Sequence, residues 1–243
     1  MVLLTNLLAL FAFAVKGLAG FGPALFIVPV LGLFWPLRQV VPYTAFLLFL
    51  ANLPMLWLVR RGLEPRRDLP AALAYAAGIV LGTRLLVTVP EARLKFALGV
   101  VLLVFALWSL VRLPAPAAAP PLDAAELARL LAVMVSGGLI VGALGAGALP
   151  LFIYLPLRYP PAAMRALFTS AFGLGTLAWT LANWQAGLLT WPLVQLALLT
   201  LPGMLAGLFL GARLFERLPR RGQVRLVSLL LVPVALRLMG VLG

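Results

Sequence analysis

The stretch AVKGLAGFGPALFIVPV, residues 14–30, holds a lysine, three glycines within six positions and two prolines inside a long apolar run. Glycine tolerates positive φ and lets the backbone turn, and proline suits the first turn of a new helix. The pattern therefore predicts that one helix ends near Gly20 and Gly22 and that a second begins at Pro23. The sequence GALGAGALPLFIYLPL at 142–157 predicts a similar break later in the chain.

The composition around these stretches is that of a membrane protein. Of 243 residues, 64% are hydrophobic and 10% are charged, and the mean hydropathy is +1.14. Soluble domains are about 45–50% apolar and about 25% charged. We therefore expect an all-α, multi-pass protein of the inner (plasma) membrane.

Charge and residue usage exclude several other classes. The net charge of +13 comes mostly from arginines between apolar segments, which fits cytoplasmic loops and anionic lipid headgroups better than nucleic acid. Cysteine and histidine are absent, which excludes disulfides and removes the usual zinc and haem ligands. We expect no metal and no cofactor.

The apolar runs form two homologous halves. There are eight, at roughly 2–34, 39–59, 69–89, 94–112, 125–157, 162–184, 190–215 and 223–242. A membrane span needs about 20 apolar residues, and only the first and fifth runs are much longer; both are broken by glycine and proline.

An internal repeat and a linker support this division. GIVLGTRLLVTVP at 78–90 and GLFLGARLFERLP at 207–219 agree in six of thirteen columns. We predict a first repeat at 1–113, a Pro/Ala linker at 114–124 and a second repeat at 125–243. Asp123 is placed to cap the helix after the linker.

Arginine distribution separates two topologies. If all eight segments cross, the repeats are parallel and the two sides carry eleven and seven Lys or Arg residues. If the first and fifth segments are re-entrant, each half crosses three times, the repeats are inverted and the counts become thirteen and five. The positive-inside rule favours the inverted repeat, with both termini outside.

The two breaks predict an anion site. A helix N-terminus presents free N–H groups and about half a positive charge. Lys16 lies one turn before the first break, at a cost of about 2.5–3.5 kcal/mol at a bilayer centre, and all six acidic residues are in or beside loops. The substrate-binding residues we predict are Lys16, Gly20, Gly22, Pro23, Thr44, Asn52, Gly145, Gly147, Pro150, Thr169 and Ser170.

Structural roles compete with this interpretation. Lys16 can also bend to a water-filled funnel, and hydroxyls in membrane helices often bond to their own carbonyls. The pairs Gly78/Gly82 and Gly207/Gly211 indicate close helix packing. We expect Gly78→Ala to be much milder than valine at the breaks.

The chain resembles the TauE/SafE sulfite-exporter family. The resemblance rests on GLAGFGPALFIVP and GALGAGALPLFIYLP, on Thr44 and Thr169-Ser170 in the next segments, and on the GxxxG spans. Pro23 and Ala148 stand where family members have a Gly-Gly pair. The resemblance implies a transporter of sulfur-containing anions such as sulfite, sulfoacetate or other organosulfonates.

The function we predict is a secondary transporter, most simply an exporter, and not an enzyme. An anion channel is the first alternative. A membrane enzyme acting on lipid phosphates is the second, and it lacks histidine and intramembrane carboxylates for acid–base chemistry. As partners we expect a small anionic substrate and membrane lipids, no nucleic acid, and we leave a homodimer open.

Overall fold

The computed structural model describes residues 2–19, 22–59, 64–109, 118–214 and 231–241, and the side chains of 16–19, 54–59, 212 and 214 lie outside this description. The described part of the chain is helical, without strands. Its helices are α1 (Val2–Ala19), α2 (Pro23–Gly32), α3 (Leu37–Val59), α4 (Pro65–Thr88), α5 (Glu91–Ser109), α6 (Ala124–Leu144), α7 (Leu149–Arg158), α8 (Pro161–Gln185), α9 (Trp191–Leu199), α10 (Leu201–Leu214) and a short helix at 231–238.

The helix starts follow local chemistry. Proline occupies the first or second position of α2, α4, α7, α8 and α9, where its missing N–H has no intrahelical partner to lose. The Asp123 carboxylate accepts from the Glu126 amide at 2.6 Å, which confirms the cap predicted for the helix after the linker.

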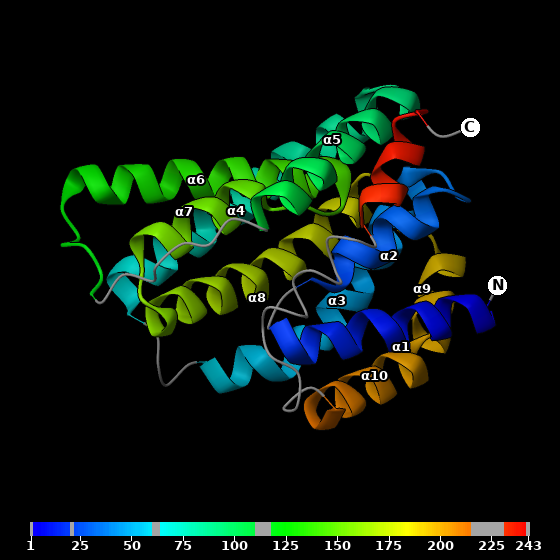
Figure 1. Ribbon diagram of the computed structural model, residues 1–243, viewed down its shortest axis with the longest axis horizontal. Coiled ribbons are helices and arrows are strands. Elements are labelled where there is room, and N and C mark those ends of the chain that lie inside the picture. Colours follow the sequence, from blue (N-terminus) through cyan, green and yellow to red (C-terminus); the bar gives the residue numbers. More distant parts are fainter. Residues whose placement is uncertain (1, 20–21, 60–63, 110–117, 215–230, 242–243) are drawn as a thin grey trace.

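The predicted breaks at the first and fifth apolar runs are present. The first run forms α1 and α2, and the fifth forms α6 and α7. Figure 1 shows both chain ends at the right of the molecule and the beginnings of α4 and α6 at the left.

The membrane-spanning content is only partly as predicted. By length and composition, α4, α5 and α6 can each cross a membrane, and α9 with α10 can form a fourth span bent by 41°. The apolar run at 190–215, predicted as one segment, is therefore two helices joined at a bend and not one straight helix. Pro202 cannot donate to the preceding turn, and Asn6 of α1 fills the break by donating to the Leu199 carbonyl and accepting from the Gly203 amide.

Two helix pairs are held together by glycine. A Cβ at Gly78 or Gly82 of α4 would overlap the backbone of α6, and one at Gly138 or Gly142 of α6 would overlap α4. The predicted role of Gly78 in close packing is therefore confirmed.

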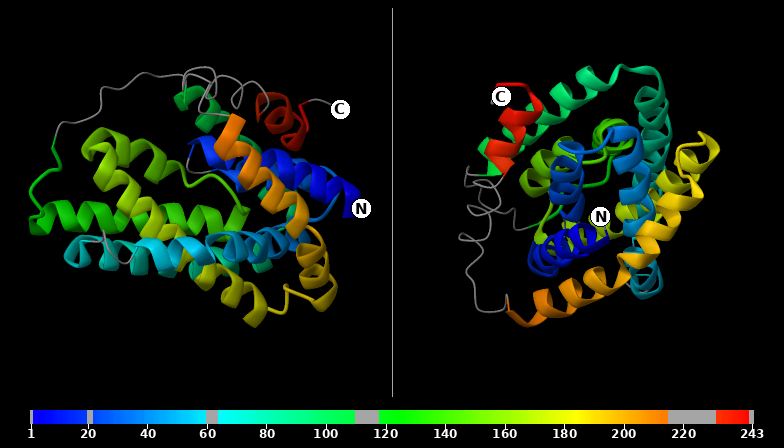
Figure 2. Two further views of the ribbon diagram at one scale, coloured as in Figure 1. Left: turned by 90° about the horizontal axis from the view of Figure 1, so that it is seen from below. Right: turned by 90° about the vertical axis from the view of Figure 1, so that its right-hand side faces the viewer.

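The second close pair is α1 with α10. Gly203, Gly207 and Gly211 of α10 lie against the backbone of Asn6, Leu10 and Ala14 in α1. The N-terminal helix therefore packs on a helix from the far end of the sequence, and Figure 2 shows α1 and α10 side by side.

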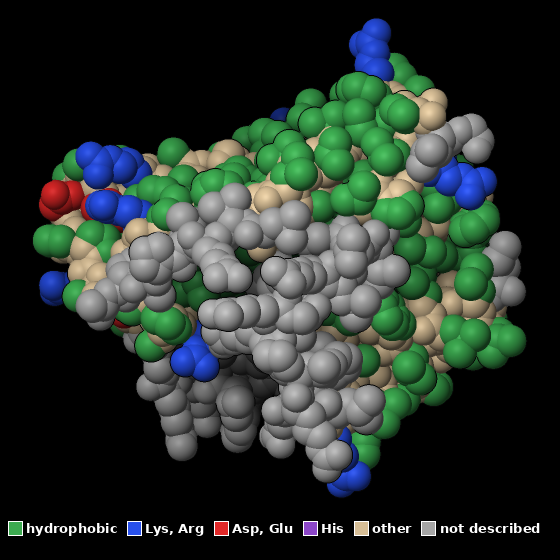
Figure 3. Space-filling view, viewed as in Figure 1, with side chains coloured by type: hydrophobic (Ala, Val, Ile, Leu, Met, Phe, Trp, Pro, Cys, Tyr) green, Lys and Arg blue, Asp and Glu red, His purple; other side chains and the backbone are tan. Residues whose placement is uncertain are grey.

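The interior is apolar and continuous across both halves. Trp179, Tyr43, Tyr75 and Tyr159 are the largest side chains that are almost fully buried. On the face in Figure 3, hydrophobic side chains cover most of the described surface, and acidic side chains gather with basic ones at the end where α4 and α6 begin.

Candidate functional site

A cavity of about 90 Å³ lies between the two helix breaks. The first break contributes Gly22, Pro23, Ala24 and Leu25, and the second contributes residues 145–148. The remaining wall comes from α3, α4, α6, α7 and α8: Leu48, Asn52, Tyr75, Ile79, Val141, Phe152, Phe168, Thr169, Phe172, Gly173, Thr176 and Trp179. By this measure one water needs roughly 10–15 Å³, so the cavity suits a molecule of a few heavy atoms.

Glycine conformation creates both breaks. Gly22 has φ 112°, and Gly145 and Gly147 have φ 81° and 83°. These values lie in the left-handed region, which side chains disfavour. The Gly145 amide still donates to the Val141 carbonyl at 2.8 Å. The last turn of α6 therefore keeps its helical hydrogen bond, and the chain turns away only after it.

The helix N-termini at the cavity lack side-chain caps. α2 begins after Gly22 and α7 begins after Ala148, and neither of these cap residues provides a side-chain hydrogen bond to the helix. The Leu25 amide donates to the Gly22 carbonyl, and the Leu149 and Leu151 amides donate to the carbonyls of Gly147 and Ala148. It is therefore the positive end of each helix dipole that favours an anion at these N-termini. Two of these ends converge on one small cavity.

Six of the predicted residues line this cavity. They are Gly22, Pro23, Asn52, Gly145, Gly147 and Thr169. Thr44, Pro150 and Ser170 do not line it. Gly20 and the side chain of Lys16 lie outside the described residues, and only the helical backbone of position 16, in α1, is described.

The threonine hydroxyls are committed to their own helices. Thr44 donates to the Val40 carbonyl at 2.7 Å, Thr169 to that of Arg165 at 2.7 Å and Thr176 to that of Phe172 at 2.8 Å. Asn52 Nδ2 lies 3.4 Å from Thr176 Oγ1. The back-bonding considered as the structural alternative for Thr44 and Thr169 is therefore present.

Sequence reasoning missed the aromatic wall. Phe168, Phe172, Thr176 and Trp179 all line the cavity from α8. Their spacing of four, four and three residues places them on one face of a helix. That periodicity was the available signal. Tyr75 of α4 adds to the wall and stacks edge-on against Phe172, with ring centroids 5.7 Å apart.

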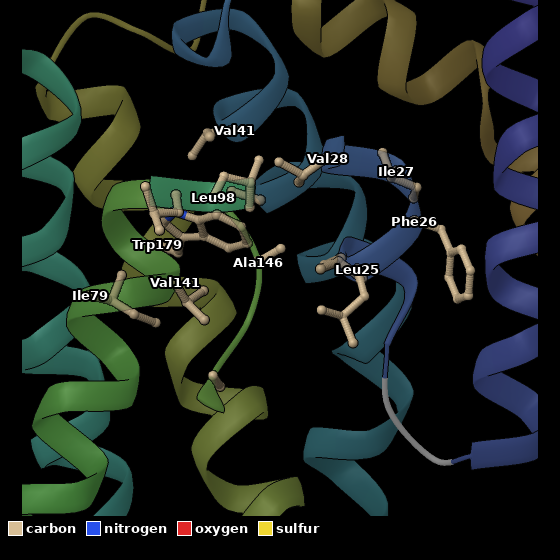
Figure 4. Packing of buried hydrophobic residues seen from close by; sticks show 14 of the residues in the cluster. Leu25, Phe26, Ile27, Val28, Val41, Ile79, Leu98, Val141, Ala146 and Trp179 are labelled. Atoms are coloured by element: carbon tan, nitrogen blue, oxygen red, sulfur yellow. The ribbon is translucent and has the colours of Figure 1, made fainter. Parts of the chain in front are cut away.

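Packed valines lie directly behind Gly145 of the cavity wall. A Cβ on Gly145 would come within 2.8 Å of Val41 and 3.1 Å of Val28, and both valines are fully buried. Figure 4 shows Val41, Val28 and Leu98 grouped on one side of Ala146, with Leu25 across from the Trp179 ring. These apolar contacts leave no room for an ion on that side.

An ion network closes the hairpin of α6 and α7 at the far end. The buried Glu126 carboxylate accepts from Tyr154 at 2.8 Å, Arg158 at 2.9 Å and Tyr159 at 3.0 Å. The guanidinium of Arg67, from the first turn of α4, lies 5.8 Å from the centre of the Tyr159 ring. The last residue of α7 is thus next to the first turn of α6.

The fold and cavity define a class of protein: an all-helical, multi-pass membrane protein with a small central cavity between two broken helices. Among the described residues, no group of three or more His, Cys, Asp or Glu side chains is placed to hold a metal ion. Residues 6–238 match the model of the family described as sulfite exporter TauE/SafE.

The chain therefore belongs to the TauE/SafE family, a family of membrane transporters and not of enzymes. Comparison with curated proteins and with solved structures gave no match. Family membership implies membrane transport of sulfur-containing anions.

Proposed function

We propose that this protein is a secondary transporter that exports small sulfur-containing anions, such as sulfite, sulfoacetate or another organosulfonate, across the inner membrane. The observation that carries the proposal is the meeting of two helix N-termini without side-chain caps at one cavity inside an apolar chain. The helix ends supply partial positive charge to an anion without placing a full charge in the bilayer.

An inverted repeat of residues 1–113 and 125–243 is part of this proposal. Arg158 bonds to Glu126 at the end of the molecule where α6 begins, so the α6–α7 hairpin returns to its starting side. Arg38 donates to the Val87 and Val89 carbonyls of the α4–α5 turn, at 2.8 and 3.1 Å, which places it at the opposite end of α4. These contacts support the thirteen-to-five arrangement of basic residues over the parallel one.

The helix pairing supports the same topology. α1 and α6 open the two halves, and α4 and α10 carry the repeated GxxxG sequence. α1 packs on α10 while α6 packs on α4, so each half lends its GxxxG helix to the other. Such an exchange is expected when two similar halves are related by a twofold axis.

The role of Lys16 remains a prediction. Its backbone lies in α1 one turn before the first break, and we propose that its ammonium group adds a full charge to the partial charges of the helix ends.

The contacts of Val28 and Val41 at Gly145 favour a transporter over a channel, because an open pore would need these side chains permanently apart.

The test is anion flux into proteoliposomes. Radiolabelled sulfite and sulfoacetate should enter vesicles that contain the protein faster than empty vesicles, and imposed pH and sodium gradients should reveal any coupling ion.

Gly22→Val should abolish flux, because its side chain would strain a φ of 112° at the cavity wall. Gly240→Ala is the matched control, since Gly240 has φ 74°, open space around it and no place in the cavity. Flux equal to that of empty vesicles for every anion would refute the proposal.

A further inference from the structure

Trp179 is a buried hydrogen-bond donor without a partner. Its side chain is 1% exposed, and its Nε1 meets no acceptor among the described residues. A buried polar group left unpaired is costly, and it calls for a specific explanation. Trp179 also lines the cavity between the two helix breaks, and its ring lies beside Ala146 of the second break (Figure 4).

Tyr75 lies on the same wall and is also buried. It is 2% exposed, and its hydroxyl makes no hydrogen bond within the described part of the chain. The ring is held in place by Gly175 of α8, where a Cβ would come within 2.6 Å of it, and by Phe172. Because the ring is already fixed in place, its hydroxyl can bind a ligand without a further large loss of side-chain entropy.

Other polar side chains around the cavity already donate hydrogen bonds within the protein. Thr169 and Thr176 donate to backbone carbonyls, and Asn52 Nδ2 points to Thr176. Thr169 and Thr176 can therefore accept a hydrogen bond but not offer one without breaking another. Trp179 therefore has a donor with unused capacity on the described wall, and the Tyr75 hydroxyl is a second donor there.

We propose that the Trp179 indole N–H and the Tyr75 hydroxyl are the side-chain donors that bind the oxygens of the transported anion. The inference rests on the proposed function and assigns specificity within the same cavity. Indole N–H groups only donate, so this position pairs with an acceptor oxygen and binds an ionised one more strongly than a neutral one. The two helix ends supply partial positive charge to the anion, and the two neutral donors fix the orientation of its oxygens.

The first measurement is calorimetric titration of the purified protein with sodium ethanesulfonate and sodium sulfite. Trp179→Phe removes the N–H and keeps an aromatic ring, and Tyr75→Phe removes one oxygen. Each should weaken anion binding about ten- to a hundredfold, the range for a hydrogen bond to a charged group. Trp191→Phe is the matched control, since Trp191 is 67% exposed on α9 and outside the cavity; it should bind like the wild type.

The second measurement separates direct contact from packing. The protein has six tryptophans, so 15N-tryptophan labelling gives up to six indole signals, and the one missing in Trp179→Phe belongs to Trp179. Saturation with ethanesulfonate should move that proton signal downfield and leave the signal of Trp191 in place.

Three results have distinct meanings. Loss of affinity in both cavity variants with a shifted Trp179 signal supports the inference. Wild-type affinity in both variants, or an unmoved Trp179 signal at saturation, overturns it while leaving the transporter proposal intact. If Trp179→Phe fails to fold, Tyr75→Phe still provides the affinity test. Absence of binding by the wild-type protein to either anion would count against the proposed function itself.

Discussion

Alanine at Gly145 should destabilise the protein through two separable effects. Gly145 has φ 81°, and a left-handed backbone costs a residue with a side chain about 1–2 kcal/mol. The new Cβ would also come within 2.8 Å of Val41 and 3.1 Å of Val28, and overpacking of this kind costs about 1–3 kcal/mol. We therefore expect Gly145→Ala to lower the free energy of unfolding by about 2–5 kcal/mol in total.

Gly187 provides the control that isolates the backbone effect. It has φ 69°, and a Cβ added there would meet no atom within 4 Å, so Gly187→Ala should show the conformational cost alone, about 1–2 kcal/mol. Both variants can be unfolded in mixed micelles with increasing SDS and followed by tryptophan fluorescence. In a double-mutant cycle, Val41→Ala should recover part of the excess loss in Gly145→Ala. Equal losses at the two glycines would refute the packing argument, and no loss at either would refute the backbone conformation.

Three further predictions concern topology, charge and helix packing. With Glu64→Cys or Val2→Cys as the only cysteine, a membrane-impermeant thiol reagent should label position 2 and not position 64 from outside intact cells; the reverse pattern would exclude the inverted topology. Lys16→Met should fold and bind anions about ten- to a hundredfold more weakly, and wild-type affinity in calorimetry would show that the helix ends suffice. Gly78→Ala should lower the free energy of unfolding by about 1–3 kcal/mol, because its Cβ would overlap the Val135 carbonyl; an SDS midpoint equal to that of the wild type would show that α4 and α6 can separate freely.

The last of these predictions goes beyond what the sequence suggested. The GxxxG pattern correctly indicated close packing at Gly78, but not how little space was left. Side-chain tolerance depends on the distance to a neighbouring backbone, and that distance is set by α6, which lies beyond the whole of α5 in the sequence. The spacing of glycines within α4 carries no information about its distance from the backbone of α6.

The helix breaks themselves were predictable because their causes are local. Gly22, Gly145 and Gly147 adopt the positive φ values that glycine permits, and Asp123 caps α6 through its own side chain. The bend after α9 was not predicted, although Pro202 marked it, because the break is stabilised by Asn6 from the opposite end of the chain.

The cavity wall was only half predictable for a related reason. Thr169 and Asn52 stand out as polar residues in apolar segments, whereas Trp179 and Tyr75 look like ordinary core aromatics until the burial and pairing of their polar atoms are known. The buried Glu126 was assigned to a loop edge, because no residue near it in sequence predicts its contacts with two tyrosines and an arginine.

The bond between Asn6 and the break after α9 has a consequence for biosynthesis. Ribosomes deliver α1 to the membrane first, yet the Leu199 carbonyl and the Gly203 amide that pair with Asn6 are made almost two hundred residues later. During that interval Asn6 Nδ2 can keep its bond to the Val2 carbonyl of its own helix, but its second N–H and its Oδ1 must be satisfied by water, lipid headgroups or the insertion machinery. The first half of the chain therefore cannot reach its final packing on its own, and completion of the fold waits for the arrival of α10.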